Sequence, residues 1–173
     1  MWRLQSSHDA MNTLIYRLGH LINRSQCYRF SSATSVSGGN SNEANDTTIV
    51  QQLQKVDGGK IQLEKCDNSK IAILTIDNER IRNALSGSMM VQLRDAVNKL
   101  EEWKEGKGVI LIGAGGNFCS GADLNIAKQF NSPEHGEAMC KLMQNTLTKF
   151  KRLPLISTAV IEGKALGGGA EVS

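Results

Sequence analysis

Proline, aromatic residues and long apolar runs are scarce in this sequence. Its 173 residues include 2 prolines and 5% aromatic residues. No apolar run approaches the roughly 18 residues that a membrane-spanning helix needs, so we expect no membrane partner. The 40% hydrophobic and 21% charged residues are typical of a folded domain with one core.

Cysteine is also sparse and carries no recognisable pattern. Cys27, Cys66, Cys119 and Cys140 are scattered, without the C-x-x-C spacing of metal sites. We therefore expect no metal and no disulfide framework, but reduced thiols of the kind found inside cells. With no histidine near it in the sequence, Cys119 is interpreted as a small packing residue.

Acidic residues are almost absent from the first 42 positions, where Asp9 is the single acid against four arginines. From Glu43 onward 16 acids balance 16 bases, so no basic footprint for a nucleic-acid partner remains. The Arg- and Ser-rich start, with apolar residues at helical spacing, is typical of a mitochondrial targeting segment. A disordered or mis-started N-terminus is the alternative.

The composition divides the chain into two parts. Residues 1–48 are interpreted as a targeting-like or disordered segment that ends in a Ser-, Gly- and Asn-rich linker from Ser31 to Thr48. The folded part is expected to begin near Val56 and to run to Ser173.

Strand and helix patterns alternate through the folded part, which predicts an α/β fold with a partly parallel sheet. Alternating and continuous apolar runs predict strands at 61–65, 71–76, 108–113 and 155–161, the last one buried, with a hairpin turn at Asn68 and Ser69. Helices are predicted after the caps Ser86 and Ser132, the second with Pro133 in its first turn and Pro154 after its end. The first helix carries an apolar stripe with alternating spacings of four and three residues: Met89, Leu93, Ala96, Leu100 and Trp103.

Two glycine-rich loops follow the third and fourth predicted strands. Residues 113–124 contain no lysine after the glycines and no G-x-G-x-x-G, which argues against a nucleotide-phosphate loop. Residues 165–171, ALGGGAE, place three glycines at a junction from strand to helix. Glycines there let backbone N–H groups approach a ligand, and two such groups suit an oxyanion. Ala122 and Gly168 are the candidate donors.

Three motifs follow one another along the folded part: NALS at 83–86, FCSGADL at 118–124 and ALGGGAE at 165–171. In this order they resemble the crotonase (enoyl-CoA hydratase/isomerase) superfamily, and the resemblance extends from about Gly58 to Ser173. It implies a crotonase-like ββα spiral fold, of which this chain holds the N-terminal part only. We expect a truncated chain, because the family's later portion is missing after Ser173.

The resemblance also implies roles for individual residues. Ala122 and Gly168 would hold the oxygen of an acyl-CoA thioester, and Glu171 would orient the substrate or move a proton. The CoA moiety would be bound by Arg80, Ile81, Arg82, Ala84, Gly121, Asp123, Leu124 and Gly167. For Arg80 and Arg82 the alternative is a solvated loop arginine, and for Asp123 it is an anchor of the loop or helix.

Residues 100–108 and 143–157 resemble a decarboxylating branch of the superfamily. It implies removal of CO₂ from ethylmalonyl-CoA, and less well from methylmalonyl-CoA, with no cofactor besides the CoA of the substrate. The resemblance further implies a metabolite-proofreading role in the cytosol, whereas the N-terminal composition favours the mitochondrial matrix. It also implies that the full-length relatives form homotrimers or hexamers. Hydration or isomerisation of an enoyl-CoA is one alternative. An inactive fragment that binds acyl-CoA or forms oligomers is another.

Overall fold

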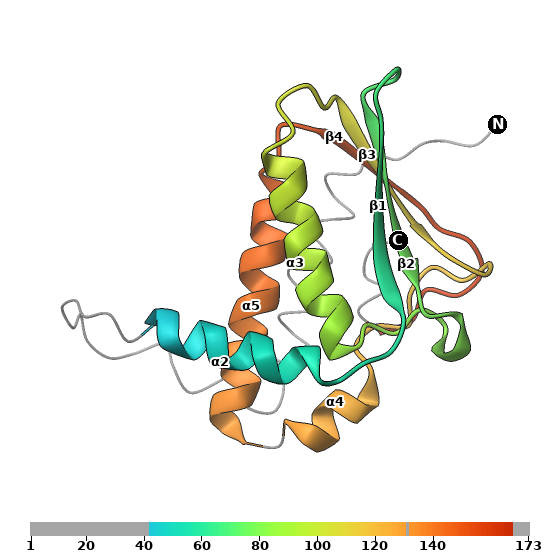
Figure 1. The fold of residues 1–173 in the computed structure, drawn as a ribbon. Helices are drawn as coiled ribbons and strands as arrows, with labels where there is room; N and C mark the ends of the chain where they lie inside the picture. The colour runs from blue at the N-terminus through green and yellow to red at the C-terminus, as the bar shows by residue number, and fades with distance from the viewer. Residues whose placement is uncertain (1–41, 131, 168–173) are drawn as a thin grey trace.

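The computed structural model describes residues 42–130 and 132–167 (Figure 1). Within these ranges strands and helices alternate after a first helix. Their order is α2 (Asn42–Gln54), β1 (Lys60–Cys66), β2 (Ile71–Asp77), η2 (Glu79–Ile81), α3 (Gly87–Glu101), β3 (Gly108–Gly113), α4 (Leu124–Gln129), α5 (Pro133–Lys151) and β4 (Ile156–Val160). The predicted α/β class is confirmed.

The four strands form one sheet in the order β1-β2-β3-β4. β1 and β2 are an antiparallel hairpin, in which Lys60 pairs with Asp77 and Cys66 with Ile71. β2 with β3 and β3 with β4 are parallel pairs, as the alternation of strands and helices predicts. The loops after β2, β3 and β4 therefore leave the same edge of the sheet.

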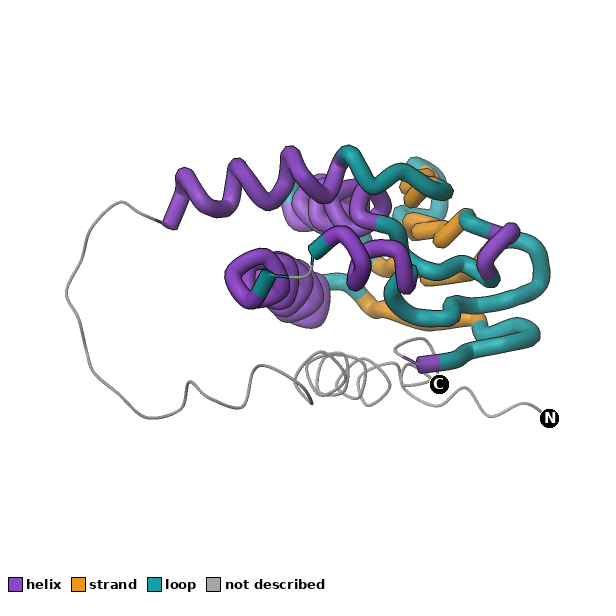
Figure 2. Tube along the Cα trace, turned by 90° about the horizontal axis from the view of Figure 1, so that it is seen from below, coloured by secondary structure: helices purple, strands orange, loops and turns teal. Residues whose placement is uncertain are grey.

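One face of the sheet is covered by helices, and Figure 2 shows the long helices gathered on that side. Along β2, Ala72 and Leu74 have no exposed surface, whereas the alternate residues Ile71 and Ile73 are 36% and 38% exposed. This alternation follows from the period of two along a strand. The core therefore lies between the sheet and α3, α5 and α2.

Local signals place the two long helices as the sequence predicts. The Ser86 hydroxyl accepts a hydrogen bond from the Met89 N–H, and the Ser132 hydroxyl accepts one from the His135 N–H, so each helix begins at a side-chain cap. Pro133 occupies the first turn of α5, where its missing N–H costs no helical hydrogen bond. The apolar stripes of both helices face the core, with Met89 and Leu100 almost fully buried on α3.

Two parts of the predicted fold need correction. α2 begins at Asn42, inside the expected linker, and the core includes Ile49 and Leu53, so the folded part starts before Val56. β4 was expected to be buried, but it is the last strand of the sheet and Ile156 is 78% exposed. The short elements η2 and α4 were not predicted.

Candidate active site

Three loops lie side by side at the carboxyl ends of the parallel strands, at the right of Figure 1. Backbone bridges join them in pairs: Leu85 pairs with Ala122, and Cys119 pairs with Ala165. We call this group the loop cluster, and it consists of residues 78–86, 114–123 and 161–167. Loops at this edge of a parallel sheet are the usual place for a ligand in α/β folds. The cluster brings the NALS and FCSGADL motifs and the start of ALGGGAE together.

The bridge between Leu85 and Ala122 leaves the Ala122 N–H unpaired within the part of the chain that the structure describes. The Leu85 N–H donates to the Gly121 carbonyl at 2.8 Å, and the Asp123 N–H donates to the Leu85 carbonyl at 2.9 Å. Because N–H groups alternate in direction along extended backbone, the N–H of Ala122 points away from Leu85. It has no hydrogen-bond partner within the described residues, and Ala122 is exposed. An unpaired N–H is one requirement for an oxyanion donor.

Two glycines of the predicted CoA-binding set adopt backbone angles that favour glycine. Gly121 has φ +92° and Gly167 has φ +53°. A Cβ on Gly167 would lie 3.4 Å from the Ser120 carbonyl oxygen, so the loops after β3 and β4 approach closely there. Gly168 and Glu171 lie outside the described residues, and their roles stay predictions.

Asp123 and Leu124 follow directly after Ala122. The Asp123 carboxylate accepts a hydrogen bond from the Asn125 N–H at 2.9 Å and caps α4, which is the anchoring role weighed for it from the sequence. Leu124, the first residue of α4, is 79% exposed.

The segment expected to meet CoA forms η2 and the turn after it. The N–H groups of Ile81, Arg82 and Ala84 all donate to carbonyl groups of the same loop. The Ile81 carbonyl also accepts from the Ser120 hydroxyl at 2.9 Å, and Ala84 is buried. Arg80, Ile81 and Arg82 remain exposed, so this segment offers a ligand mainly side chains and the carbonyl groups of the two arginines. Its contact with CoA remains a prediction.

Two asparagines at the base of the loop cluster were missed as candidates. The Asn83 side chain has no exposed surface and Asn78 is 8% exposed, and both amides bond to backbone groups of the loops. Asn83 also has φ +57°, a left-handed conformation that asparagine adopts more readily than most residues. Its place in the NALS motif was the available sequence signal.

Cys119 is a buried residue of the loop cluster. Its sulfur accepts a hydrogen bond from the Gly121 N–H at 3.4 Å. Burial raises the pKa of the Cys119 thiol, and the Gly121 hydrogen bond offsets this only in part. A thiol that stays protonated and covered is a packing residue rather than a nucleophile, as the sequence indicated.

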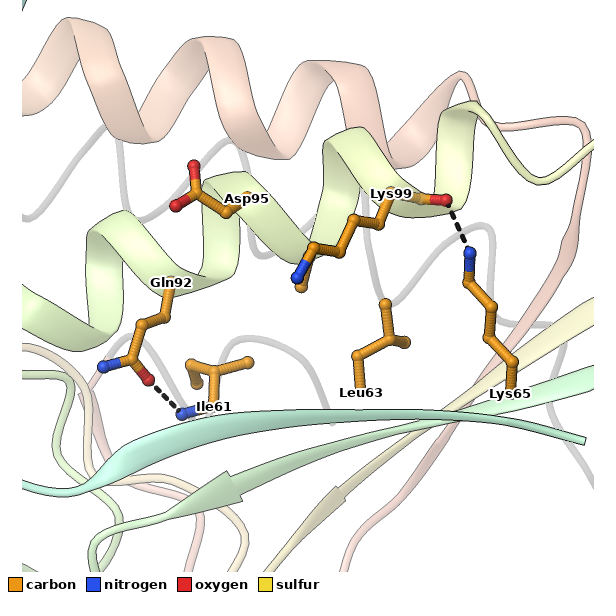
Figure 3. A pocket seen from close by; sticks show the side chains of 7 residues that line it. Ile61, Leu63, Lys65, Gln92, Asp95 and Lys99 are labelled. Atoms are coloured by element: carbon orange, nitrogen blue, oxygen red, sulfur yellow. Dashed lines mark hydrogen bonds between the residues drawn. The ribbon is translucent and has the colours of Figure 1, made fainter.

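Of two surface hollows formed by described residues, one adjoins the loop cluster and the other does not. The larger, of about 480 Å³, lies between β1 and α3 (Figure 3). It is lined by Ile61, Leu63, Lys65, Gln92, Asp95, Ala96 and Lys99. None of these belongs to the loop cluster, so this hollow is not the site that the motifs predict. Polar groups at its rim already have partners: the Gln92 oxygen accepts from the Ile61 N–H at 2.7 Å, and Lys65 donates to the Lys99 carbonyl at 2.9 Å.

The smaller hollow, of about 340 Å³, includes Asp123 and lies between the end of α2 and α4. It mixes the basic Lys55 and Lys128 with the acidic Asp57 and Asp123. No group of three His, Cys, Asp or Glu residues that could hold a metal ion occurs within 42–130 and 132–167. In the same ranges no helix is long and apolar enough to cross a membrane.

Comparison with known proteins gives this arrangement a family. The model of the family "Enoyl-CoA hydratase/isomerase" matches residues 67–173. The chain is 51% identical to the ethylmalonyl-CoA decarboxylase of Xenopus tropicalis over 134 residues, which are 77% of this chain and 44% of that protein. It is 54% identical to the ethylmalonyl-CoA decarboxylase of Homo sapiens over 123 residues, 71% of this chain and 40% of that protein.

A solved structure agrees with these relatives. The enoyl-CoA hydratase from Bacillus anthracis superposes with a TM-score of 0.58 at 31% identity, and the match covers 65% of this chain and 43% of that one. The chain thus spans less than half the length of the relatives it matches. The family match extends from the turn between β1 and β2 through the whole loop cluster, so the crotonase-like fold inferred from the motifs is confirmed. The chain belongs to the enoyl-CoA hydratase/isomerase family.

Proposed function

We propose that this chain supplies the oxyanion-binding loops of an acyl-CoA decarboxylase that acts on ethylmalonyl-CoA and, less well, on methylmalonyl-CoA. The observation that carries the proposal is the N–H of the exposed residue Ala122, which has no hydrogen-bond partner among the described residues. An amide in this position stabilises negative charge on a thioester oxygen, and removal of one such donor typically costs about 10²–10³ in rate.

The chemistry needs few groups. The bond between the substrate's α-carbon and its carboxylate breaks, CO₂ leaves, and the electron pair moves into the thioester to form an enolate. The N–H groups of Ala122 and Gly168 bind the enolate oxygen. A proton delivered to the α-carbon completes the product, and Glu171 is the proposed residue for orienting the substrate or delivering that proton. CoA enters as part of the substrate, and the proposal includes no further cofactor.

The relatives of this chain support two candidate reactions to different degrees. The curated relatives that are 51% and 54% identical to this chain are ethylmalonyl-CoA decarboxylases. The Bacillus anthracis structure, 31% identical, is an enoyl-CoA hydratase and supports hydration of an enoyl-CoA as the second candidate. The higher identity favours decarboxylation.

Product analysis by mass spectrometry separates the candidates. The purified chain is mixed with ethylmalonyl-CoA in one tube and with crotonyl-CoA in another. Butyryl-CoA in the first tube supports the decarboxylase, and 3-hydroxybutyryl-CoA in the second supports the hydratase instead. If neither appears, titration with butyryl-CoA in a calorimeter decides whether the chain is an inactive acyl-CoA-binding fragment. Absence of binding would overturn an acyl-CoA site altogether.

An Ala122→Pro variant tests the site itself. The Ala122 N–H has no partner within the described residues, so proline removes a donor to the ligand rather than a bond of the fold. We expect turnover to fall by about 100-fold or more. The thermal unfolding midpoint of the variant controls for misfolding. Unchanged turnover in a folded variant would remove Ala122 from the oxyanion site.

The wider setting is part of the same proposal. We place the protein in the cytosol, where it would remove carboxylated by-products of fatty-acid metabolism, and we expect its full-length relatives to form trimers or hexamers. A fluorescent fusion tests the location, and a mitochondrial signal would support the targeting-like interpretation of residues 1–48. Light scattering of a full-length relative tests the assembly.

A further inference from the structure

Asn83 lies at the centre of the loop cluster with every polar atom of its side chain bonded. Its side-chain N–H groups donate to the carbonyl oxygens of Ala114 at 2.8 Å and Asn117 at 2.7 Å. Its side-chain oxygen accepts from the Asn78 N–H at 2.8 Å. The side chain has no exposed surface. One amide therefore joins the loop after β2 to the loop after β3.

Two further asparagines extend this connection. The Asn117 side-chain oxygen accepts from the Lys164 N–H at 3.3 Å, which links the loop after β3 to the loop after β4. The Asn78 side chain donates to the Ala84 carbonyl at 2.8 Å, just before the bridge to Ala122. The three asparagines thus connect the loop that carries Ala122 with the loop that leads into Gly168.

The position at Asn83 is demanding. The side chain must provide two donors and one acceptor in a buried place, on a backbone with φ +57°. Aspartate provides no donor and would set a charge against two carbonyl oxygens, and alanine provides nothing and strains the backbone. Loss of the amide leaves two part-buried carbonyl groups and the buried Asn78 N–H without these partners, which is more costly than loss of an exposed hydrogen bond.

We propose that Asn83 is a positioning residue, which holds the loop that carries Ala122 in a fixed place relative to the loops after β2 and β4. Asn117 continues this connection to Lys164. The effect on the loops stands on the hydrogen bonds alone. The effect on catalysis rests on the proposed function. Because Asn83 is buried, it acts through the loops and touches no substrate.

Hydrogen exchange of the Asn83→Gly variant tests the effect on the loops. Glycine accepts φ +57° without strain, so the variant removes the amide and keeps the backbone conformation. We expect the amides of 114–123 and 162–167 to exchange about tenfold faster or more, while those of α3 and α5 keep their rates. Lys70→Gly is the matched control, because Lys70 has φ +58° and lies in the β1–β2 hairpin. It should leave exchange of the loop cluster unchanged.

A milder variant covers the case in which Asn83→Gly does not fold. Asn117→Ala removes only the acceptor for the Lys164 N–H and a weak contact to the Gly115 carbonyl. We expect faster exchange in 162–167 and unchanged exchange at 78–86. Equal exchange in wild type and both variants would overturn the proposal, and so would a uniform increase across the whole fold.

Steady-state kinetics adds a readout that a merely structural role would not move. In Asn83→Gly we expect kcat to fall about tenfold or more, with KM within about threefold, because misplaced amides lose the transition state more than the bound substrate. Faster loop exchange with unchanged kcat would overturn the catalytic part. If wild type turns over no acyl-CoA while the loops of the variant exchange faster, the proposed function fails and the positioning of the loops stands.

Discussion

The two ends of the sheet are held by different chemistry. At the carboxyl end, the loop cluster is tied by buried, uncharged amides, with Asn83 at 0% exposure. At the other end, the β1–β2 hairpin meets the segment before β3 through exposed groups: Lys70 forms an ion pair with Glu105, and the Lys65 ammonium lies 5.3 Å from the centre of the Trp103 ring. Backbone hydrogen bonds from Lys107 and Gly108 to the Lys70 carbonyl complete this end.

The interactions at the β1–β2 hairpin join two segments, whereas those in the loop cluster also fix the position of the loops. Exposed ion pairs are weak and tolerate movement, because water and salt compete for both partners. Buried amides have fixed donors and acceptors, and each unmade bond is costly, so they allow one arrangement only. The end of the sheet that bears the motifs is the end whose hydrogen bonds allow less variation in geometry. This is expected if its loops must hold two amides around one atom.

The largest effect is expected for Gly163→Ala, which disrupts the packing between the loops after β3 and β4 in the loop cluster. Gly163 has φ +56°, and a Cβ there would lie 2.0 Å from the Gly116 carbonyl oxygen. Gly116→Ala is the matched control, because Gly116 has φ +71° and a Cβ there would meet nothing within 4 Å. We expect the control to lose about 1–2 kcal/mol of unfolding free energy from backbone strain alone. Gly163→Ala should lose at least about 3 kcal/mol in urea titration, since overpacking adds to the strain. Equal losses would mean that these two loops do not pack closely.

Thiol labelling compares the two ends directly. Cys66 is exposed, and hydrogen bonds from the Ser69 side chain and from the backbone of Ser69 and Asn68 lower the pKa of its thiol, whereas burial raises the pKa of Cys119. We expect iodoacetamide to modify Cys66 about 100-fold faster or more at neutral pH, read by peptide mass spectrometry. The two rates should converge in denaturant. Comparable rates in the native protein would show that the loop cluster opens readily.

The smallest effect is expected for the Lys70–Glu105 pair. A hydrogen bond from Lys70 lowers the pKa of Glu105, so the contribution of this carboxylate is lost as pH falls through the acid range. The same bond raises the pKa of Lys70, so the contribution of the ammonium is lost as pH rises through the alkaline range. Lys70→Met should lower the melting temperature slightly at neutral pH, and the difference should vanish at both extremes and in high salt.

Lys107→Met is the control for the loss of a charge at the same end, because Lys107 is exposed and has no ion pair within the described residues. Thermal unfolding across pH compares the two variants. A pH-independent difference for Lys70→Met would assign its effect to the φ +58° turn rather than to the ion pair.

Local patterns were enough to predict most of the fold. The spacing of apolar residues and the caps Ser86 and Ser132 identified α3 and α5, and the apolar runs identified all four strands. α2 was missed because its first half is polar and its burial at Leu53 depends on α3, which is distant in sequence. The exposure of Ile156 was missed because the apolar sequence of β4 predicts a strand but does not show that the strand lies at the edge of the sheet.

The site was predictable in its motifs and not in its geometry. The proposed role of Ala122 depends on its backbone N–H, whose direction is set by the bridge to Leu85 and cannot be read from the residue type. Asn83 was quoted within a motif, yet its partners Ala114 and Asn117 are 31 and 34 residues away. Such pairings belong to the assembled sheet. The roles of Gly168 and Glu171 remain predictions from the motif.

The spacing of these partners also orders events during synthesis on the ribosome. The hairpin partners Cys66 and Ile71 emerge together, whereas Asn117 waits for Lys164, 47 residues later. At the usual elongation rate of about 5–20 residues per second, that wait lasts roughly 2–9 seconds. During this interval the hairpin at the opposite end already has its complete sequence, but the loop cluster does not. The incomplete loop cluster is therefore accessible to chaperones until Lys164 has been synthesised.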